Sequence, residues 1–155
     1  MEAQTFFIRS VTVQNVIMAV VVAIVLVLLI RFVQQGKKSH VVLVALWGLV
    51  ALWFFNGPLW GFSAVTVSRK GLELHYGFLS FQKNTTLPAE SPWTIQRYLG
   101  GIRKLKKLYY FELPGHQSLK VRGEDKLETL KALGAAIDGL NGKPMGKFEE
   151  RPVNL

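Results

Sequence analysis

The residues of this sequence best suited to chemistry form a dense group of cations. Four positive charges fall within the five residues 103–107, on a predicted connection between two strands, and three further cations lie on neighbouring predicted strands. Such a density of Lys and Arg predicts a site for anions, either phospholipid headgroups or acidic loops of a partner protein. The alternative is a solvated run of charge that aids solubility. The candidate residues are Arg103, Lys104, Lys106, Lys107, Arg97, Lys120 and Arg122.

Other residue types that catalyse reactions or bind metals form no recognisable pattern in the sequence. The three histidines, His40, His75 and His116, lie far apart, with no carboxylate at ligand spacing. A Gly-x-Ser-x-Gly elbow and a glycine-rich phosphate loop are missing, and the sequence contains no cysteine. We therefore predict no catalytic residue, no metal site and no cofactor, and a protein that is not an enzyme.

Two long apolar runs precede the cationic group. Residues 16–30 and 41–55 contain no charged side chain, and with their mildly polar flanks they extend over about 12–33 and 41–62. Crossing the hydrocarbon core of a bilayer takes about 20 helical residues. The connecting residues 34–40 are few, so we predict a transmembrane helical hairpin and a membrane anchor over residues 1–62. The alternative is a hydrophobic hairpin buried inside a soluble protein.

Aromatic side chains gather at the end of the second run. Rings of this kind prefer the headgroup level of a bilayer, so we predict an interfacial belt rather than a ligand cage. Asn56, Gly57 and Pro58 interrupt the helical pattern in the same region, which predicts a kink or an exit from the helix. The belt residues are Trp53, Trp60, Phe54, Phe55 and Phe62.

Charge indicates both a partner and an orientation. The chain has a formal net charge of +9, and residues 63–155 carry 15 Lys and Arg against 9 Asp and Glu. Beside a membrane this balance favours anionic headgroups as a partner over nucleic acid. Three cations occupy the hairpin loop and four lie near the opposite ends of the runs. With the cationic group added, this count predicts a multi-pass protein of the inner or plasma membrane, with the N-terminus and the C-terminal domain in the cytoplasm.

Beyond residue 62 the hydrophobic period changes to that of strands. Alternating residues predict strands over 65–68 and 72–76, joined at Gly71, and further strands near 78–87, 94–99, 108–113 and 118–122. The period then becomes helical, with a capping-box pattern at Asp125 and Glu128 and a stop at Asn141 and Gly142. We predict one soluble domain over residues 63–142 and a flexible tail over 143–155.

This order of elements resembles the bacterial pleckstrin-homology-like membrane proteins. The likeness is carried by VTVSRKGLELHYGFLSF, by LYYFELPGHQSLKVRG and by DKLETLKALGAAIDGL. The same plan is similar to the photosystem I assembly factor of chloroplasts and cyanobacteria, which also joins a membrane hairpin to such a domain. The resemblance implies an α+β fold, with an antiparallel sheet or barrel capped by the C-terminal helix, and a domain that serves as a docking platform without enzymatic activity.

Together these features predict a non-enzymatic, membrane-anchored scaffold, assembly factor or accessory subunit. It would dock on a larger membrane protein complex through its pleckstrin-homology-like domain, with the cationic group as the electrostatic contact. The alternative is a module that senses or binds anionic lipid directly.

Overall fold

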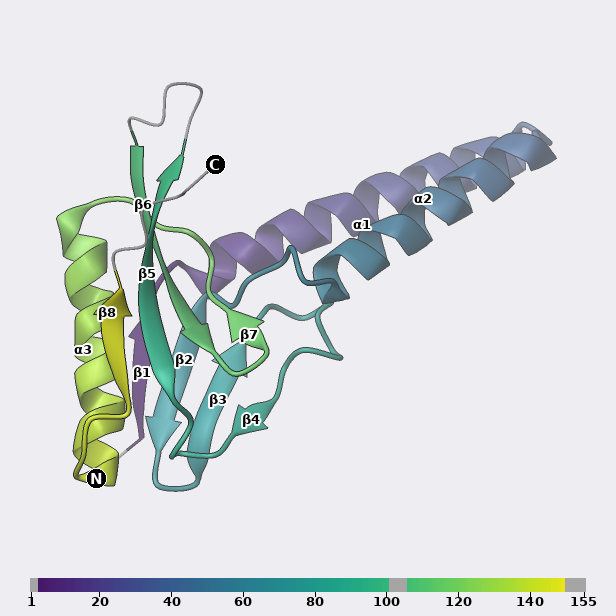
Figure 1. The fold of residues 1–155 in the computed structure, drawn as a ribbon. Helices are drawn as coiled ribbons and strands as arrows, with labels where there is room; N and C mark the ends of the chain where they lie inside the picture. Colours follow the sequence, from purple (N-terminus) through teal and green to yellow (C-terminus); the bar gives the residue numbers. More distant parts are fainter. Residues whose placement is uncertain (1–2, 101–105, 150–155) are drawn as a thin grey trace.

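The computed structural model describes residues 3–100 and 106–149, and Figure 1 shows a long helical hairpin that projects from a β-rich body. The hairpin consists of α1 (Val11–Gln34) and α2 (Lys38–Asn56). The first helix agrees with the predicted span, but the second ends six residues earlier than expected, at Asn56. Pro58 has no N–H to donate and disfavours a helical Gly57, so the chain leaves the helix there instead of kinking.

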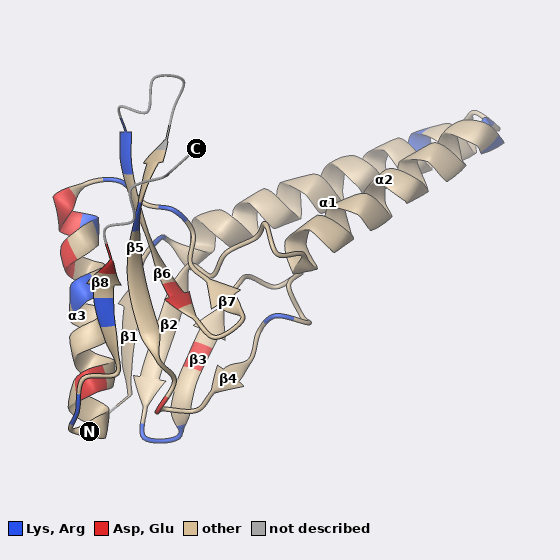
Figure 2. Ribbon diagram, in the orientation of Figure 1, with Lys and Arg blue, Asp and Glu red and all other residues tan. Residues whose placement is uncertain are grey.

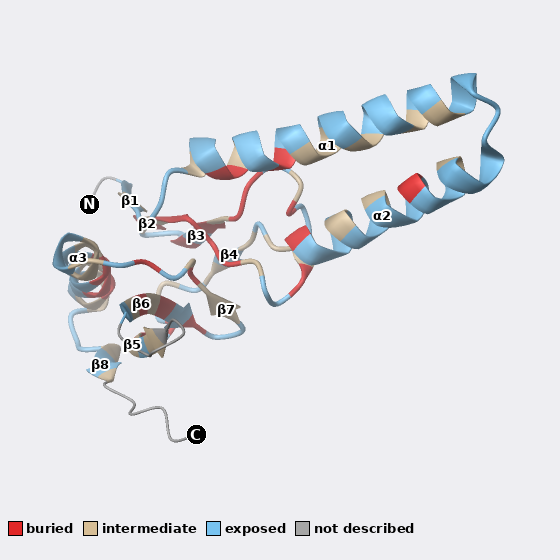
Figure 3. Ribbon diagram, turned by 90° about the horizontal axis from the view of Figure 1, so that it is seen from above, coloured by how far each residue is buried: buried red, intermediate tan, exposed pale blue. Residues whose placement is uncertain are grey.

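The hairpin has the length and the surface of membrane helices. At 1.5 Å per residue, α1 is about 36 Å long and α2 about 28 Å, compared with a hydrocarbon core of about 30 Å. Most residues of both helices are exposed, as Figure 3 shows. Only 6% and 11% of their most apolar segments are buried, so the alternative of a hairpin packed inside a globule does not describe this structure. Among the described residues, these two helices are long and apolar enough to cross a membrane.

The first sheet has the strand order β1-β2-β3-β4 and is antiparallel throughout. The predicted hairpin of β2 (Ala64–Ser68) and β3 (Gly71–His75) is present, and Gly71 has the positive φ expected at its turn. β4 (Thr86–Leu87) is short. β1 (Gln4–Phe7) was not predicted; all four of its residues pair with residues 64–67 of β2, so residues assigned to the anchor belong to the sheet.

The second sheet has the order β7-β6-β5-β8. Its centre is the antiparallel pair of β5 (Trp93–Gly100) and β6 (Lys106–Leu113), as predicted. β7 (His116–Gln117) is short, and residues 118–122 contribute isolated bridges where a full strand was expected. Residues 78–81 form turns rather than a strand.

The predicted flexible tail contains a strand. β8 (Gly146–Glu149) pairs in parallel with β5, and its first residue lies directly against the backbone of Trp93. A Cβ atom at Gly146 would overlap the Trp93 carbonyl oxygen, so only glycine permits this approach. Asp138 Oδ1 accepts hydrogen bonds from the Trp93 indole and from the Met145 N–H, both at 2.8 Å, and these bonds tie the segment before β8 to the core.

α3 (Glu124–Asn141) completes the body, which we call the β-domain. It starts after Gly123 without a side-chain cap, so the predicted capping box is wrong, whereas its end at Gly142 in the left-handed conformation agrees with the prediction. Figure 3 shows the two sheets as layers, with α3 along one side and the hairpin on the other. Leu130, Leu133 and Ile137 of α3 are buried in the core shared by both sheets. The described strands do not close into a barrel.

Two glycines of α3 test this packing as a matched pair. A Cβ atom at Gly134 would lie 2.6 Å from the ring of Trp93, which is itself stacked on Phe111, whereas a Cβ atom at Gly139 would meet nothing within 4 Å. Overpacking costs about 1–3 kcal/mol and Ala gains about 1 kcal/mol in a helix, so we expect Gly134→Ala to lower the free energy of unfolding by up to about 2 kcal/mol.

Gly139→Ala is the control and should raise the free energy of unfolding by about 0.5–1 kcal/mol. Unfolding of the detergent-solubilised protein, followed by circular dichroism, measures both changes. Equal effects of the two substitutions would contradict the contact between α3 and Trp93.

Candidate anion-binding face

Six cations from four separate segments lie around two neighbouring shallow grooves of the β-domain. One groove, of about 270 Å³, is lined by Lys106, Lys107 and Arg122 together with Tyr109, Gly123 and Glu124. The other, of about 280 Å³, is lined by Arg9, Lys120, Arg122 and Lys126 around Ile8, Leu108 and Val121. Arg122 belongs to both grooves, so they form one continuous surface. We call it the basic face: Arg9, Lys106, Lys107, Lys120, Arg122 and Lys126.

The backbone positions these cations. Tyr109 and Val121 exchange two backbone hydrogen bonds of 2.8 Å, which hold residues 120–122 beside β6. Val121 is buried, so the alternation of an extended segment exposes Lys120 and Arg122 on either side of it, as the sequence predicted. Lys106 and Lys107 are exposed at the start of β6, where the core that buries Tyr109 and Phe111 has ended.

The charges of the basic face are available to a ligand. Within the described part of the chain, no carboxylate lies within ion-pair distance of Lys106, Lys107, Lys120 or Arg122. The ammonium of Lys120 lies 4.4 Å from the centre of the Tyr98 ring, a cation–π contact that leaves its positive charge uncompensated. Glu124 lines the same groove as Lys106 and reduces the local positive potential there.

One described member of the predicted cationic group, Arg97, is not part of this face, and two other members are not described. Arg103 and Lys104 lie outside the described residues. Arg97 lies opposite Tyr109 in the ladder of β5 and β6 and is only partly exposed. In the alternation of β5 it falls on the side of the buried Trp93 and Ile95, and it lines neither groove.

Arg9 and Lys126 belong to the basic face although the sequence analysis did not include them. The backbone N–H groups of Ile8 and Arg9 both donate to the Ser63 carbonyl at 2.9 Å, so β1 carries Arg9 to this surface. The next residue, Ser10, caps α1 by accepting a bond from the Val13 N–H. The basic face therefore begins where the first apolar helix leaves the β-domain, and Figure 2 shows the helical hairpin free of charge from there to its far end.

The predicted aromatic belt divides into exposed and buried members. Trp53 is 65% exposed and Phe54 is 38% exposed, whereas Phe55 packs edge-on against Trp60 at 4.9 Å. The Trp60 indole donates to the Tyr76 carbonyl at 3.0 Å. Phe62 is completely buried beside Tyr76 in the core of the β-domain, so it cannot reach a headgroup layer. The chain has already turned into the sheets at this point, because α2 ends at Asn56.

A half-buried polar cluster joins the end of α2 to the second sheet. Lys83 Nζ donates to the carbonyls of Gly57 and Trp60, both at 2.7 Å, and satisfies acceptors just beyond the helix end. It also lies over the Tyr76 ring, whose hydroxyl is 2.7 Å from His116 Nδ1. Burial lowers the pKa of Lys83 and raises that of Tyr76, and burial together with the charge of Lys83 lowers the pKa of His116. Among the described residues, no three His, Asp or Glu side chains form a group that could hold a metal ion.

This cluster predicts a pH dependence of stability. Because the folded state favours neutral His116, the unfolded state binds the extra proton once the pH falls below the usual value of 6.5. Stability should therefore decline as the pH falls from about 6.5 towards the lowered pKa of His116. His116→Gln should flatten this part of the profile in thermal unfolding of the solubilised protein. His40→Gln, at the far end of the hairpin, is the control. If stability declines equally in the His116→Gln variant, groups other than His116 cause the decline.

Comparisons with protein-family models, with curated proteins and with solved structures gave no match to this chain, so its function is argued from its own residues.

Proposed function

We propose that this chain is a non-enzymatic, membrane-anchored docking protein. In this proposal the α1–α2 hairpin spans the bilayer, and the β-domain acts as a scaffold or accessory subunit on a larger membrane protein complex. The basic face provides the electrostatic contact with acidic loops of that complex. The two exposed apolar helices support the anchor, because exposing an apolar surface of this size to water would be unfavourable.

One observation carries the proposal: the basic face begins at the root of α1 and continues outward to Lys106 and Lys107. Because Arg9 is one residue before the cap of α1, this end of the face lies close to the depth at which the helix would enter the headgroup layer. The outer end can meet protein loops that project from a neighbouring membrane protein. Electrostatic complementarity of this kind orients partners and speeds their encounter in the plane of the membrane.

The resemblance to pleckstrin-homology-like membrane proteins supports the same function. The antiparallel pairs β2–β3 and β5–β6 and the helix α3 are the elements that this resemblance implies. We extend the proposal to orientation: the cations on the domain side support a cytoplasmic N-terminus and β-domain.

The second candidate function is direct binding of anionic lipid by the basic face. The position of Arg9 favours it, since a cation at headgroup depth contributes about 1 kcal/mol to attraction for an anionic surface. The two functions differ in the binding partner that the basic face requires. A lipid site needs only anionic lipid, whereas a docking site needs the partner protein.

The docking function predicts that reversing the charge of the basic face weakens a specific association. We expect Lys120→Glu with Arg122→Glu to reduce co-purification of the partner complex from gently solubilised membranes at least about tenfold, because close charge pairs contribute more than about 1 kcal/mol each. Quantitative mass spectrometry of the tagged full-length protein measures the loss. Residues 63–155 alone are unsuitable for the test, since this fragment lacks β1.

The matched control is Arg69→Glu with Lys70→Glu in the turn between β2 and β3, which makes the same change of charge away from the basic face. Docking requires that this control keeps the partner while the basic-face variant loses it. Equal retention by both variants would contradict the proposed contact.

The lipid function predicts a different result. In nanodiscs that contain phosphatidylglycerol, the basic-face variant should retain less of this lipid, and the control variant should retain as much as the unmodified protein. Native mass spectrometry measures the retained lipid.

A further inference from the structure

A second apolar surface lies beside the roots of the helices, on the loop between β3 and β4. Phe78 is 51% exposed and Phe81 is 63% exposed, and Leu59 nearby in the chain after α2 is 70% exposed. Two largely exposed Phe side chains on one short loop would be unfavourable in water. We call residues 77–84, which carry both Phe side chains, the apolar loop.

Hydrogen bonds fix the apolar loop to both helices of the hairpin. Asn15 Oδ1 of α1 accepts a bond of 3.1 Å from the Phe78 N–H. Asn56 of α2 donates from Nδ2 to the Leu79 carbonyl at 2.9 Å and accepts from the Gln82 N–H at 3.1 Å. Ser80 Oγ donates to the Phe55 carbonyl at 2.7 Å. The loop therefore has a set depth relative to the two helices.

That depth coincides with the edge of the uncharged apolar runs. Asn15 is the residue before the run 16–30, and Asn56 is the residue after the run 41–55. The side chains that hold the loop thus mark the level at which both helices change from apolar to polar. In a bilayer this level is the boundary between acyl chains and headgroups, where exposed aromatic rings are favoured.

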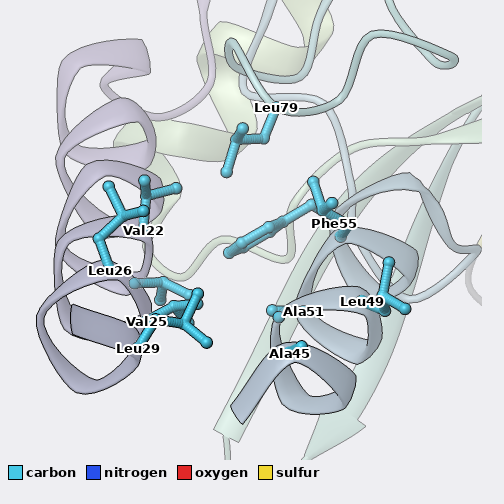
Figure 4. Close-up of a pocket in the computed structure, with 12 residues that line it drawn as sticks. Val22, Val25, Leu26, Leu29, Ala45, Leu49, Ala51, Phe55 and Leu79 are labelled. Carbon is cyan, nitrogen blue, oxygen red and sulfur yellow. The ribbon is translucent and has the colours of Figure 1, made fainter. Parts of the chain in front are cut away.

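Leu79 connects the apolar loop to the lipid-facing surface of the hairpin. Its side chain lines an apolar cavity of about 490 Å³ between α1 and α2, together with residues that include Val22, Leu26 and Phe55. Figure 4 shows Leu79 directed from the loop towards the space between the helices. The apolar surface therefore runs without interruption from the helices onto the loop, so the same solvent should cover both.

We infer that the apolar loop is a third membrane contact of this protein, inserted into the boundary between headgroups and acyl chains. The inference rests on the proposed anchoring of the α1–α2 hairpin in the bilayer. The occupant of the exposed surface of Phe78 and Phe81 is lipid, because the Asn15 and Asn56 hydrogen bonds place it at the edge of the hydrocarbon. The contact adds to the anchor a point of attachment on the β-domain itself.

The absence of cysteine from the sequence permits a direct test. Full-length Phe78→Cys and Phe81→Cys variants, labelled with an environment-sensitive fluorophore, are reconstituted into vesicles of pure lipid with brominated acyl chains. Val27→Cys, exposed in the middle of α1, is the membrane control, and Lys70→Cys, in the turn between β2 and β3, is the aqueous control. We expect quenching at positions 78 and 81 to be several-fold greater than at position 70.

Bromine near the headgroup should quench positions 78 and 81 more than bromine deep in the chain, and the reverse should hold at position 27. Quenching at position 27 together with quenching by aqueous iodide alone at positions 78 and 81 would overturn the inference and leave the anchor intact. That result would also be expected if a protein partner covered the loop, since the vesicles contain none. Quenching of all four positions by iodide alone would overturn the anchor itself.

Discussion

The hydrogen bonds between the ends of the two apolar helices and the β-domain are the constraint on which the rest of the structure depends. A helix end leaves backbone groups without partners, and hydrocarbon offers none. Here Gln14 Nε2 donates to the Gly61 carbonyl, Asn56 to the Leu79 carbonyl, and Lys83 to two carbonyls beyond α2. These bonds satisfy polar groups at and beside the ends of the two helices, and they hold the β-domain at a defined position on the hairpin.

The elements that could be predicted from the sequence are those with a sustained hydrophobic pattern. α1 is marked by one long uninterrupted apolar run, and α3, the β2–β3 hairpin and the β5–β6 pair each repeat their period over several residues. Pro58 explains the end of α2. β1 and β8 have four residues each, too few for a period to be recognised. Their pairing partners, β2 and β5, are also distant in the sequence, so propensity alone could not locate either strand.

In the candidate site too, only the residues that follow a local pattern could be predicted from the sequence. Alternation around the buried Val121 predicted the exposure of Lys120 and Arg122, because a two-residue period is a local property. Arg9 could not be found in this way, since only the pairing of β1 with β2 brings it to the same surface. Phe62 shows the converse error: Pro58 marks the end of the helix, but it does not indicate that the chain then turns into the core of the β-domain.

The proposed contacts also explain why a small domain on a hairpin would carry both charge and exposed aromatic rings. A helical hairpin would fix the depth of the β-domain in a membrane, but the hairpin and the β-domain could still tilt together relative to the bilayer normal. Arg9 lies before α1, whereas the apolar loop is bound to Asn56 at the end of α2 as well as to Asn15. Two contacts of different chemistry at these separate positions would oppose tilting in more than one direction. The outward end of the basic face, at Lys106 and Lys107, would then keep a constant orientation towards a neighbour in the membrane.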